Sequence, residues 1–261
     1  MKKSQMLRII LILLFSAAVN TASANAHWPT WRGPDTMGIA PEGNPPTTWS
    51  ETQNIKWKVK LTGDGSNSSP IVWGDKIFFQ TAVDTGIKDT SSVAAPAPPR
   101  TEFAQARREG DRRRRTGFGR GRGRGRGGFG SKPPTTQFKF NLVCMDRGTG
   151  KVLWEKTVCQ LKPHQGHHRH HGYASFSPVT DGQYVWANFG SRGIYCYDME
   201  GNQIWSKELP QMSTMFGEGT SPSLAGDALI VVADHRGDSS IFAFDKKTGN
   251  LLWKEARDES T

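Results

Sequence analysis

The chain has 261 residues, of which 35% are hydrophobic and 22% are charged, and its formal net charge is +10. Between Arg100 and Lys132, eleven Arg and one Lys stand against three acidic residues, which is a local charge of +9. The rest of the chain is nearly neutral, so the positive charge is mostly local and says little about the remainder of the protein.

The N-terminus has the pattern of an export signal. Lys2, Lys3 and Arg8 precede an apolar run at residues 9–15, and Ala24-Asn25-Ala26 presents the small residues that signal peptidase accepts. The run is shorter than the ~20 residues that span a bilayer, so a transmembrane segment is the weaker alternative. We predict that residues 1–26 are a signal peptide cleaved after Ala26, and that the mature protein is periplasmic or secreted without a transmembrane anchor.

Two patterns alternate after a lead-in segment at residues 27–53. The first consists of Ser-Pro, a short apolar run, a Gly/Asp turn and an aromatic or β-branched run, and it begins at Ser69, Ser177 and Ser221. The second consists of Asp, a polar Gly turn and a run that ends in Trp, and it occupies residues 146–154, 198–205 and 245–253. Gly and Asp tolerate the positive φ of tight hairpin turns, so each pattern predicts a two-stranded hairpin.

The two hairpins together form a repeat of four antiparallel strands. Trp154 and Trp205 are 51 residues apart, and Trp205 and Trp253 are 48 apart, a spacing typical of repeat architectures. A small sheet of this size buries both faces only by stacking on copies of itself, which predicts an all-β fold, a β-propeller of four-stranded blades over residues 54–261. Propellers close with about four to eight blades. We therefore expect about three blades in an incomplete ring, with one strand around Trp57 before them, and interpret the chain as an N-terminal fragment or truncated product.

A structural role is predicted for the tryptophan that ends each outer hairpin. A large apolar ring fits over a turn glycine of the neighbouring blade, where the missing side chain leaves room. The Asp of each repeat is expected to bind the backbone amides of its own turn. The predicted structural tryptophans are Trp57, Trp154, Trp205 and Trp253.

A low-complexity insert rich in Arg, Gly and Pro interrupts the first repeat at about residues 91–135. Such a composition buries too little apolar surface to offset chain entropy, so we predict that it is disordered. Its Arg-Gly runs favour an anionic polymer or lipid as partner. Flexible segments of this kind also bind nucleic acid, but an export signal makes that alternative the weaker one.

A histidine-rich segment at residues 164–175 is the part of the chain in which metal chemistry is most plausible from composition. Neutral imidazole is a ligand for Zn, Cu and Ni. The spacing matches no known metal motif, so a solvent-exposed loop is the favoured interpretation and the metal stays unknown. The weak candidate ligands are His164, His167, His168, His170 and His171.

The three cysteines are an odd number for an oxidising compartment. Cys144 and Cys196 occupy equivalent repeat positions, and Cys159 follows the first outer hairpin. Because cysteine is often buried, we favour free buried thiols, with their pairing left open.

The loops that precede the Ser-Pro strands are equivalent, and we expect them on one face beside the central channel. Propellers commonly place binding sites there. The candidate ligand-binding residues on this loop face are Asn67, His171, Tyr173 and Glu218. The residues indicate no catalytic set.

The repeats at Asp146–Trp154 and Asp245–Trp253 resemble those of the pyrroloquinoline-quinone-like (PQQ-like) β-propeller superfamily, which includes quinoprotein alcohol dehydrogenases and the BamB outer-membrane assembly factor. The motifs from Trp28 to Gly33 and at Trp49 resemble the lead-in of secreted members, many from planctomycete-type bacteria. The resemblance implies either an exported, non-catalytic binding or scaffold module of the cell envelope, or a dehydrogenase fragment that binds pyrroloquinoline quinone (PQQ) and Ca²⁺. We favour the first, with an envelope protein or glycan as partner and no confident cofactor, because no catalytic set is evident.

Overall fold

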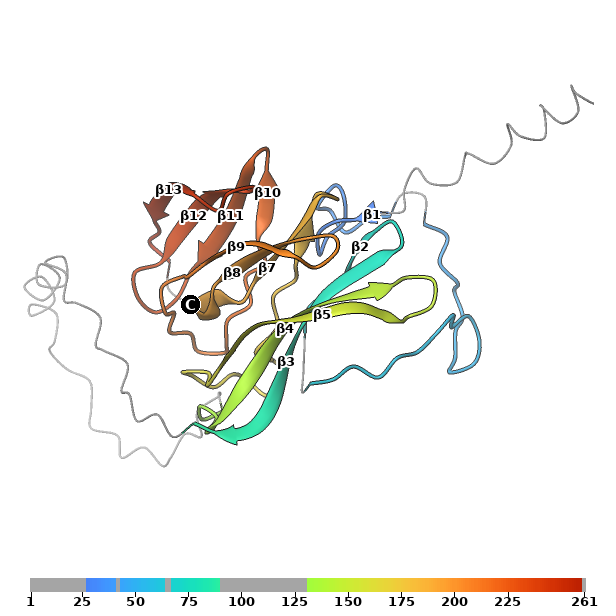
Figure 1. Cartoon of the computed structure of the whole chain (residues 1–261), viewed down its shortest axis with the longest axis horizontal. Helices are drawn as coiled ribbons and strands as arrows, with labels where there is room; N and C mark the ends of the chain where they lie inside the picture. The colour runs from blue at the N-terminus through green and yellow to red at the C-terminus, as the bar shows by residue number, and fades with distance from the viewer. Residues whose placement is uncertain (1–26, 41–42, 64–66, 90–130, 260–261) are drawn as a thin grey trace, which may run out of the picture.

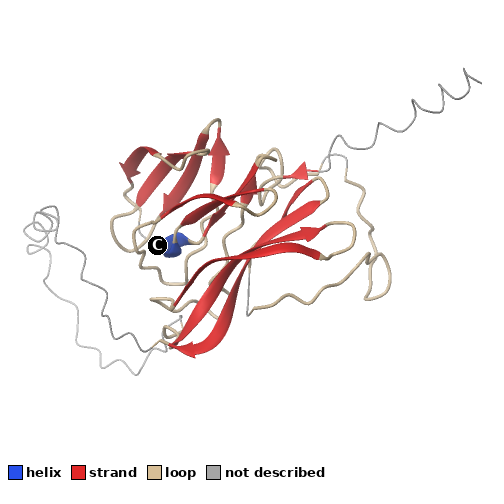
Figure 2. Ribbon diagram, viewed as in Figure 1, coloured by secondary structure: helices blue, strands red, loops and turns tan. Residues whose placement is uncertain are grey.

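The computed structural model describes residues 27–40, 43–63, 67–89 and 131–259. Three antiparallel sheets stand side by side around a common centre (Figure 1). A 3-10 helix, Gly190–Arg192, lies close to that centre among the strands and loops of Figure 2. Within the described ranges, no helix has both the length and the apolarity to cross a membrane. The predicted signal peptide at 1–26, and most of the insert at 91–135, lie outside the described residues.

The first sheet has five strands in the order β1-β2-β3-β4-β5. Its strands are β1 (His27–Trp28), β2 (Ile71–Trp73), β3 (Lys76–Lys88), β4 (Thr136–Asp146) and β5 (Val152–Leu161). Strands β3 and β4 pair from Lys76↔Asp146 to Lys88↔Thr136. The insert therefore separates, in sequence, two strands that remain neighbours in the sheet.

The second and third sheets each have four strands in sequence order. The second contains β6 (Val179–Thr180), β7 (Tyr184–Asn188), β8 (Ile194–Asp198) and β9 (Gln203–Lys207). The third contains β10 (Ser223–Ala225), β11 (Ala228–Ala233), β12 (Ser240–Asp245) and β13 (Leu251–Ala256). The predicted all-β fold with about three antiparallel blades in an incomplete ring is confirmed.

The hydrophobic core lies between the sheets. One cluster joins Phe78, Phe140 and Leu142 of the first sheet to Val185 and other residues of the second. A second cluster joins Trp186 and Cys196 of the second sheet to Leu229, Val231 and Phe244 of the third. Each sheet therefore buries apolar side chains against its neighbour, and this burial is the main favourable contribution to holding the blades together.

A tryptophan lies over the turn glycine of each outer hairpin and comes from the segment or repeat that precedes it in sequence. Its ring comes within 2.6–2.9 Å of the Cβ that the glycine lacks, which leaves no room for a side chain. The pairs are Trp57 with Gly150, Trp154 with Gly201, and Trp205 with Gly249. In each pair the indole N–H donates to the carbonyl of the residue after the turn aspartate, at 2.9–3.1 Å. The repeated pattern thus acts between blades, through both packing and a hydrogen bond.

The aspartate of each outer hairpin holds its own turn. Asp146 Oδ1 accepts hydrogen bonds from the Thr149 backbone N–H at 2.7 Å and from its hydroxyl at 2.6 Å, and Asp245 and Thr248 repeat the arrangement. These hydrogen bonds lower the pKa of the Asp146 and Asp245 carboxyls, because they favour the ionised form.

The part of the chain before β2 differs from the prediction in two ways. Trp57 lies in a segment without strand pairing, although a strand was expected around it. Its ring still covers the outer face of the first sheet beside Phe79, Val143 and Met145. In addition, β1 joins the edge of the first sheet, where the His27 and Trp73 rings stack 4.1 Å apart. The sequence around β1 has too few residues in strand for a periodic pattern to reveal it.

Substitutions at two glycines of the third sheet distinguish the cost of an unfavourable backbone conformation from the cost of a steric clash. Gly226 and Gly249 both have left-handed φ, +60° and +70°, but a Cβ at Gly226 would meet nothing within 4 Å, whereas one at Gly249 would lie 2.6 Å from Trp205. We expect Gly226→Ala to cost about 1 kcal/mol, and Gly249→Ala about 1–3 kcal/mol more, because Trp205 is displaced. Urea unfolding measures both, and equal losses would contradict the predicted contact.

Candidate functional site

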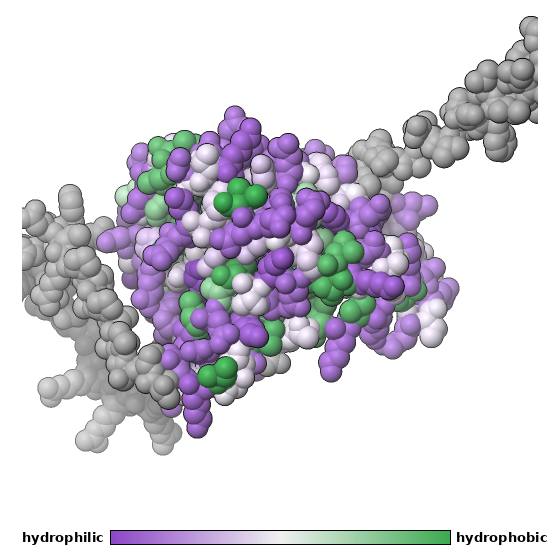
Figure 3. Space-filling model, in the orientation of Figure 1, coloured by the Kyte–Doolittle hydropathy of each residue, from purple (hydrophilic) through white to green (hydrophobic). Residues whose placement is uncertain are grey.

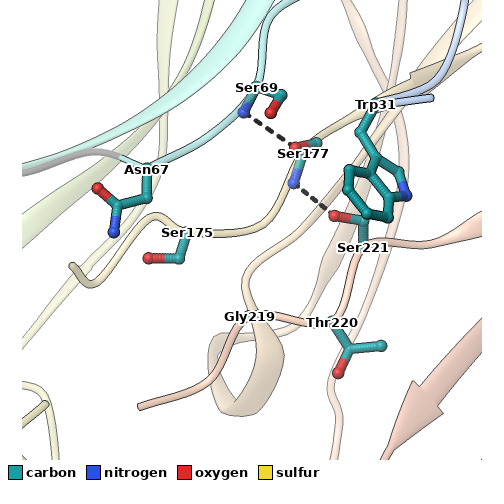
Figure 4. Close-up of a pocket in the computed structure, with 8 residues that line it drawn as sticks. All are labelled: Trp31, Asn67, Ser69, Ser175, Ser177, Gly219, Thr220 and Ser221. Atoms are coloured by element: carbon teal, nitrogen blue, oxygen red, sulfur yellow. Dashed lines mark hydrogen bonds between the residues drawn. The ribbon is translucent and has the colours of Figure 1, made fainter. Parts of the chain in front are cut away.

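The three Ser-Pro motifs meet at the centre of the sheets. The Ser69 backbone N–H donates to Ser177 Oγ at 2.9 Å, and the Ser177 N–H donates to Ser221 Oγ at 2.9 Å (Figure 4). Proline has no N–H to donate, which suits a position just before the start of a strand. The motif therefore links consecutive blades through the serine while it begins the inner strand of each. We call this region the hub.

Two buried amides add a second link between blades close to the hub. Gln80 Nε2 of β3 donates to the Asn188 carbonyl at 2.8 Å, and Asn188 Nδ2 of β7 donates to the Thr220 carbonyl at 2.9 Å. Both amide side chains are almost fully buried. Because a buried polar group is costly without a partner, these bonds define how the blades sit against one another.

A cavity of about 390 Å³ opens at the hub. Figure 4 shows the side chains that surround it, which come from the lead-in segment and from the loops before all three inner strands. Its lining consists of Trp31, Asn67, Ser69, Ser175, Ser177, Gly219, Thr220 and Ser221. None of these side chains is charged, and five of them carry a hydroxyl group.

A buried ion pair lies beside the hub. Glu218 Oε2 is 3.4 Å from Arg192 Nη1, and both side chains are 3% exposed or less. The same oxygen accepts the Ser191 N–H at 2.7 Å, while Oε1 accepts the Ser191 hydroxyl at 2.9 Å and Gln165 Nε2 at 3.2 Å. The Glu218 carboxylate is thus satisfied within the protein.

Arg192 is also enclosed by aromatic rings. Its guanidinium carbon is 4.9 Å from the Phe140 ring centroid and 5.6 Å from that of Tyr173, and Nη1 donates to the Phe189 carbonyl at 3.2 Å. Its Nε has no hydrogen-bond partner among the described residues. A cavity of about 10 Å³ bounded by Gln165, Tyr173, Arg192 and Glu218 lies beside it, close to the volume that one water molecule needs.

The structure brings the four predicted loop-face residues into one region but not onto one surface. Asn67 lines the hub cavity, and its Nδ2 donates to the His170 carbonyl at 2.8 Å. Tyr173 and Glu218 line the small cavity, where the Tyr173 hydroxyl donates to the Gln165 carbonyl at 3.1 Å. The His171 ring packs where a Cβ of Gly217 or Gly219 would otherwise lie.

The five candidate metal-binding histidines are spread over separate interactions. His164 Nε2 is 2.7 Å from the Met212 carbonyl, so this nitrogen carries a proton and donates. The rings of His168 and His170 are 5.3 Å apart, and those of His167 and His171 are 6.4 Å apart. Across the described ranges, no three His, Cys, Asp or Glu side chains form a group that could hold a metal ion.

The described cavities do not fit Ca²⁺ and pyrroloquinoline quinone. Ca²⁺ takes six to eight oxygen ligands, commonly including carboxylates. Glu218 borders the small cavity and also a third cavity of about 290 Å³, which Asp234 lines as well. Each carboxylate is paired: Glu218 with Arg192, and Asp234 with Arg257 at 2.8 Å. The hub cavity also has no basic side chain in its lining that could bind the carboxylates of the quinone.

Several residues of this region were missed by the sequence analysis. Trp31 lies in the Trp-rich motif of the lead-in segment, and the serines lie in the repeated Ser-Pro motif. Both motifs are visible in the sequence and could have placed these residues at the site. Arg192 and Ser191 carried no such signal, because they lie in the 3-10 helix that follows β7, where the repeats share no pattern.

The pH dependence of stability should depend on His171. Burial lowers the pKa of His171 below its ordinary value, with the nearby His167 and His168 acting in the same direction. Below about pH 6.5 the unfolded chain therefore binds this proton more readily than the folded chain, so the free energy of unfolding should fall as the pH falls. His171→Gln should flatten this slope between pH 7.5 and about 5 in urea unfolding, whereas an unchanged slope would assign it to other groups.

The cysteines are free thiols in the structure. Cys144 and Cys196 are buried on β4 and β8, and Cys159 is partly buried on β5. Burial raises the pKa of Cys144 to about 12 and raises the pKa of Cys159 and Cys196 as well. Since the thiolate is the reactive form, we expect these thiols to be inert in the folded protein.

A protein-family model matches the repeat region of the chain. Residues 139–261 match the family model described as outer membrane protein assembly factor BamB. No curated protein matches the sequence.

Three solved structures illustrate the similarity in architecture. A europium-containing methanol dehydrogenase is 10% identical over 72% of this chain and 24% of its own, with a TM-score of 0.39. A quinohemoprotein alcohol dehydrogenase from Pseudomonas putida is 11% identical over 89% and 27%, with a TM-score of 0.46. BamB from Moraxella catarrhalis is 16% identical over 48% and 35%, with a TM-score of 0.29. The chain spans about a quarter to a third of these structures, and identities this low carry no functional argument.

Proposed function

We propose that this chain, whose residues 139–261 match the family model described as outer membrane protein assembly factor BamB, is an exported, non-catalytic propeller section that binds an envelope partner at the hub. The observation that carries this proposal is the state of Glu218. A catalytic base or Ca²⁺ ligand needs an available carboxylate, and Glu218 is buried, paired with Arg192 and bonded to Ser191 and Gln165. The hub cavity beside it offers neutral hydroxyl and amide groups, which favour binding over acid–base chemistry.

The proposal also includes a cellular location and a class of binding partner. The signal-peptide pattern at residues 1–26 supports a periplasmic or secreted location, and the family description supports an envelope setting. The face of the molecule seen in Figure 3 is mostly hydrophilic, and its apolar side chains lie in separate patches. Such a surface favours recognition of an envelope protein or glycan through polar groups, with the Arg-Gly insert as a second, electrostatic contact to anionic polymers.

A cofactor test separates this proposal from the dehydrogenase alternative. Purified full-length chain is mixed with pyrroloquinoline quinone and CaCl₂, and the quinone absorbance and dye-linked alcohol oxidation are followed. We expect neither a saturable absorbance shift nor turnover, because the two carboxylates that border the cavities, Glu218 and Asp234, are each paired with an arginine. A saturable shift accompanied by alcohol oxidation would replace the proposal with the dehydrogenase.

A binding test addresses the envelope partner. The full chain, and a variant lacking residues 91–135, are sedimented with isolated bacterial cell envelopes in salt that screens exposed charges. We expect both proteins to cosediment, because the hub remains in each. If deletion of the insert abolishes cosedimentation, the insert and not the hub is the binding site. If neither protein cosediments, the proposal of an envelope partner is wrong.

A further inference from the structure

We propose that the hub cavity binds a neutral saccharide unit, with Trp31 as its stacking platform and the hub serines as its hydrogen-bond donors. This inference rests on the proposed function, and it specifies the ligand class of the same site. The cavity of about 390 Å³ lies within the ~300–1,000 Å³ typical of small-molecule sites.

The lining offers hydrogen-bond capacity that the protein itself does not use. Ser177 Oγ and Ser221 Oγ each accept one backbone N–H, and neither hydroxyl donates to another described residue. Asn67 uses its Nδ2 on the His170 carbonyl, which leaves Oδ1 as an acceptor. A hydroxyl both donates and accepts, so the wall can bind the alternating donors and acceptors of a polyol.

The charge of the lining selects against ionic ligands. None of the eight residues around the cavity is charged, and the nearby carboxylate of Glu218 is neutralised by Arg192. A charged ligand would lose its hydration without gaining an oppositely charged partner from these eight residues, which costs several kcal/mol. A neutral polar ligand pays no such penalty.

Trp31 adds an apolar surface to this polar wall. Its side chain borders the cavity in Figure 4, and 49% of the residue is exposed although it is large and aromatic. The Arg32 guanidinium lies 4.2 Å from its ring centroid, which helps to hold the indole in place. The C–H face of a sugar ring is apolar and its rim is polar, so one saccharide unit matches both the indole and the serines.

The experiment titrates the full chain with neutral disaccharides, namely maltose, cellobiose, lactose and N,N′-diacetylchitobiose, and follows ligand-detected NMR and tryptophan fluorescence. Glucuronic acid and the uncharged peptide Gly-Ser-Gly serve as comparison ligands. We expect at least one disaccharide to bind at millimolar concentration, and Trp31→Ala to weaken it about tenfold, equivalent to ~1.4 kcal/mol of lost stacking. Trp49→Ala, which removes a 68%-exposed tryptophan outside the cavity lining, should leave binding unchanged.

Three results would overturn the inference: no disaccharide binds, binding survives Trp31→Ala, or the peptide or the glucuronic acid binds more tightly than every disaccharide. Thermal melting of Trp31→Ala verifies its fold, and Trp31→Phe, which keeps an aromatic face, should recover part of the affinity. These failures are distinguishable from failure of the proposed function. A chain that cosediments with envelopes but binds no saccharide disproves only the ligand class.

Discussion

Replacing Trp205 by Ala should lower the free energy of unfolding by about 3–5 kcal/mol, the usual loss for a buried aromatic. Trp205 is 8% exposed, fills the space over Gly249, and packs in the cluster shared by the second and third sheets. Its indole N–H donates to the Lys246 carbonyl at 3.0 Å, an oxygen that also accepts the Trp186 N–H at 2.9 Å. The substitution therefore removes packing and a hydrogen bond between blades together.

Trp253 supplies the matched control, because it occupies the same place in the last described repeat. It is 43% exposed, and no described glycine turn lies against it. Trp253→Ala should change stability by no more than about 0.5 kcal/mol. Urea unfolding monitored by circular dichroism compares the two variants. Equal losses would show that the tryptophan stabilises its own hairpin and not the contact between blades.

Removing the Glu218 side chain should have the second large effect, a loss of about 3–5 kcal/mol for Glu218→Ala. The substitution leaves the Arg192 charge buried without a counter-charge, and such changes are strongly destabilising. It also leaves the Ser191 N–H and hydroxyl without their shared acceptor. Urea unfolding of Glu218→Ala against the unmodified chain measures the loss.

Two further variants test the cause. The double change Arg192→Met with Glu218→Leu removes both charges and should recover most of the loss, since replacing a buried pair by apolar groups is often neutral. Glu51→Gln breaks an exposed pair with Lys58, whose side chains are 85% and 74% exposed, and should cost less than about 1 kcal/mol. A double variant no more stable than Glu218→Ala would mean that shape, and not charge, governs this site.

The repeated hairpins were predictable because their causes are local. A Gly or Asp turn between two β-branched or aromatic runs sets hairpin geometry within about ten residues, and three copies in register imply a stack of sheets. Strands β4 and β5 around the Asp146 turn, and β12 and β13 around the Asp245 turn, follow this rule.

The segment before β2 and the hub were less predictable because their contacts are distant in sequence. Trp57 reaches the Arg147 carbonyl across 90 residues, and Asn67 reaches the His170 carbonyl across 103. The Arg192–Glu218 pair joins a 3-10 helix to a loop of the next repeat. Equivalence of the loops predicted that Asn67, His171, Tyr173 and Glu218 lie in one region, but not which cavity each side chain borders.

The sequence by itself determined the blade, its turns and the identity of the inner and outer strands, because hydrophobic period and turn chemistry act over a few residues. Only the tertiary structure decided that Glu218 is paired with Arg192 and that the hub presents neutral hydroxyls beside Trp31. The physical reason is that burial and pairing of a side chain depend on which surfaces meet when the blades stack. The stacking of the blades therefore decides whether a carboxylate is free to bind a ligand or is already paired within the protein. The residues next to that carboxylate in sequence do not decide it.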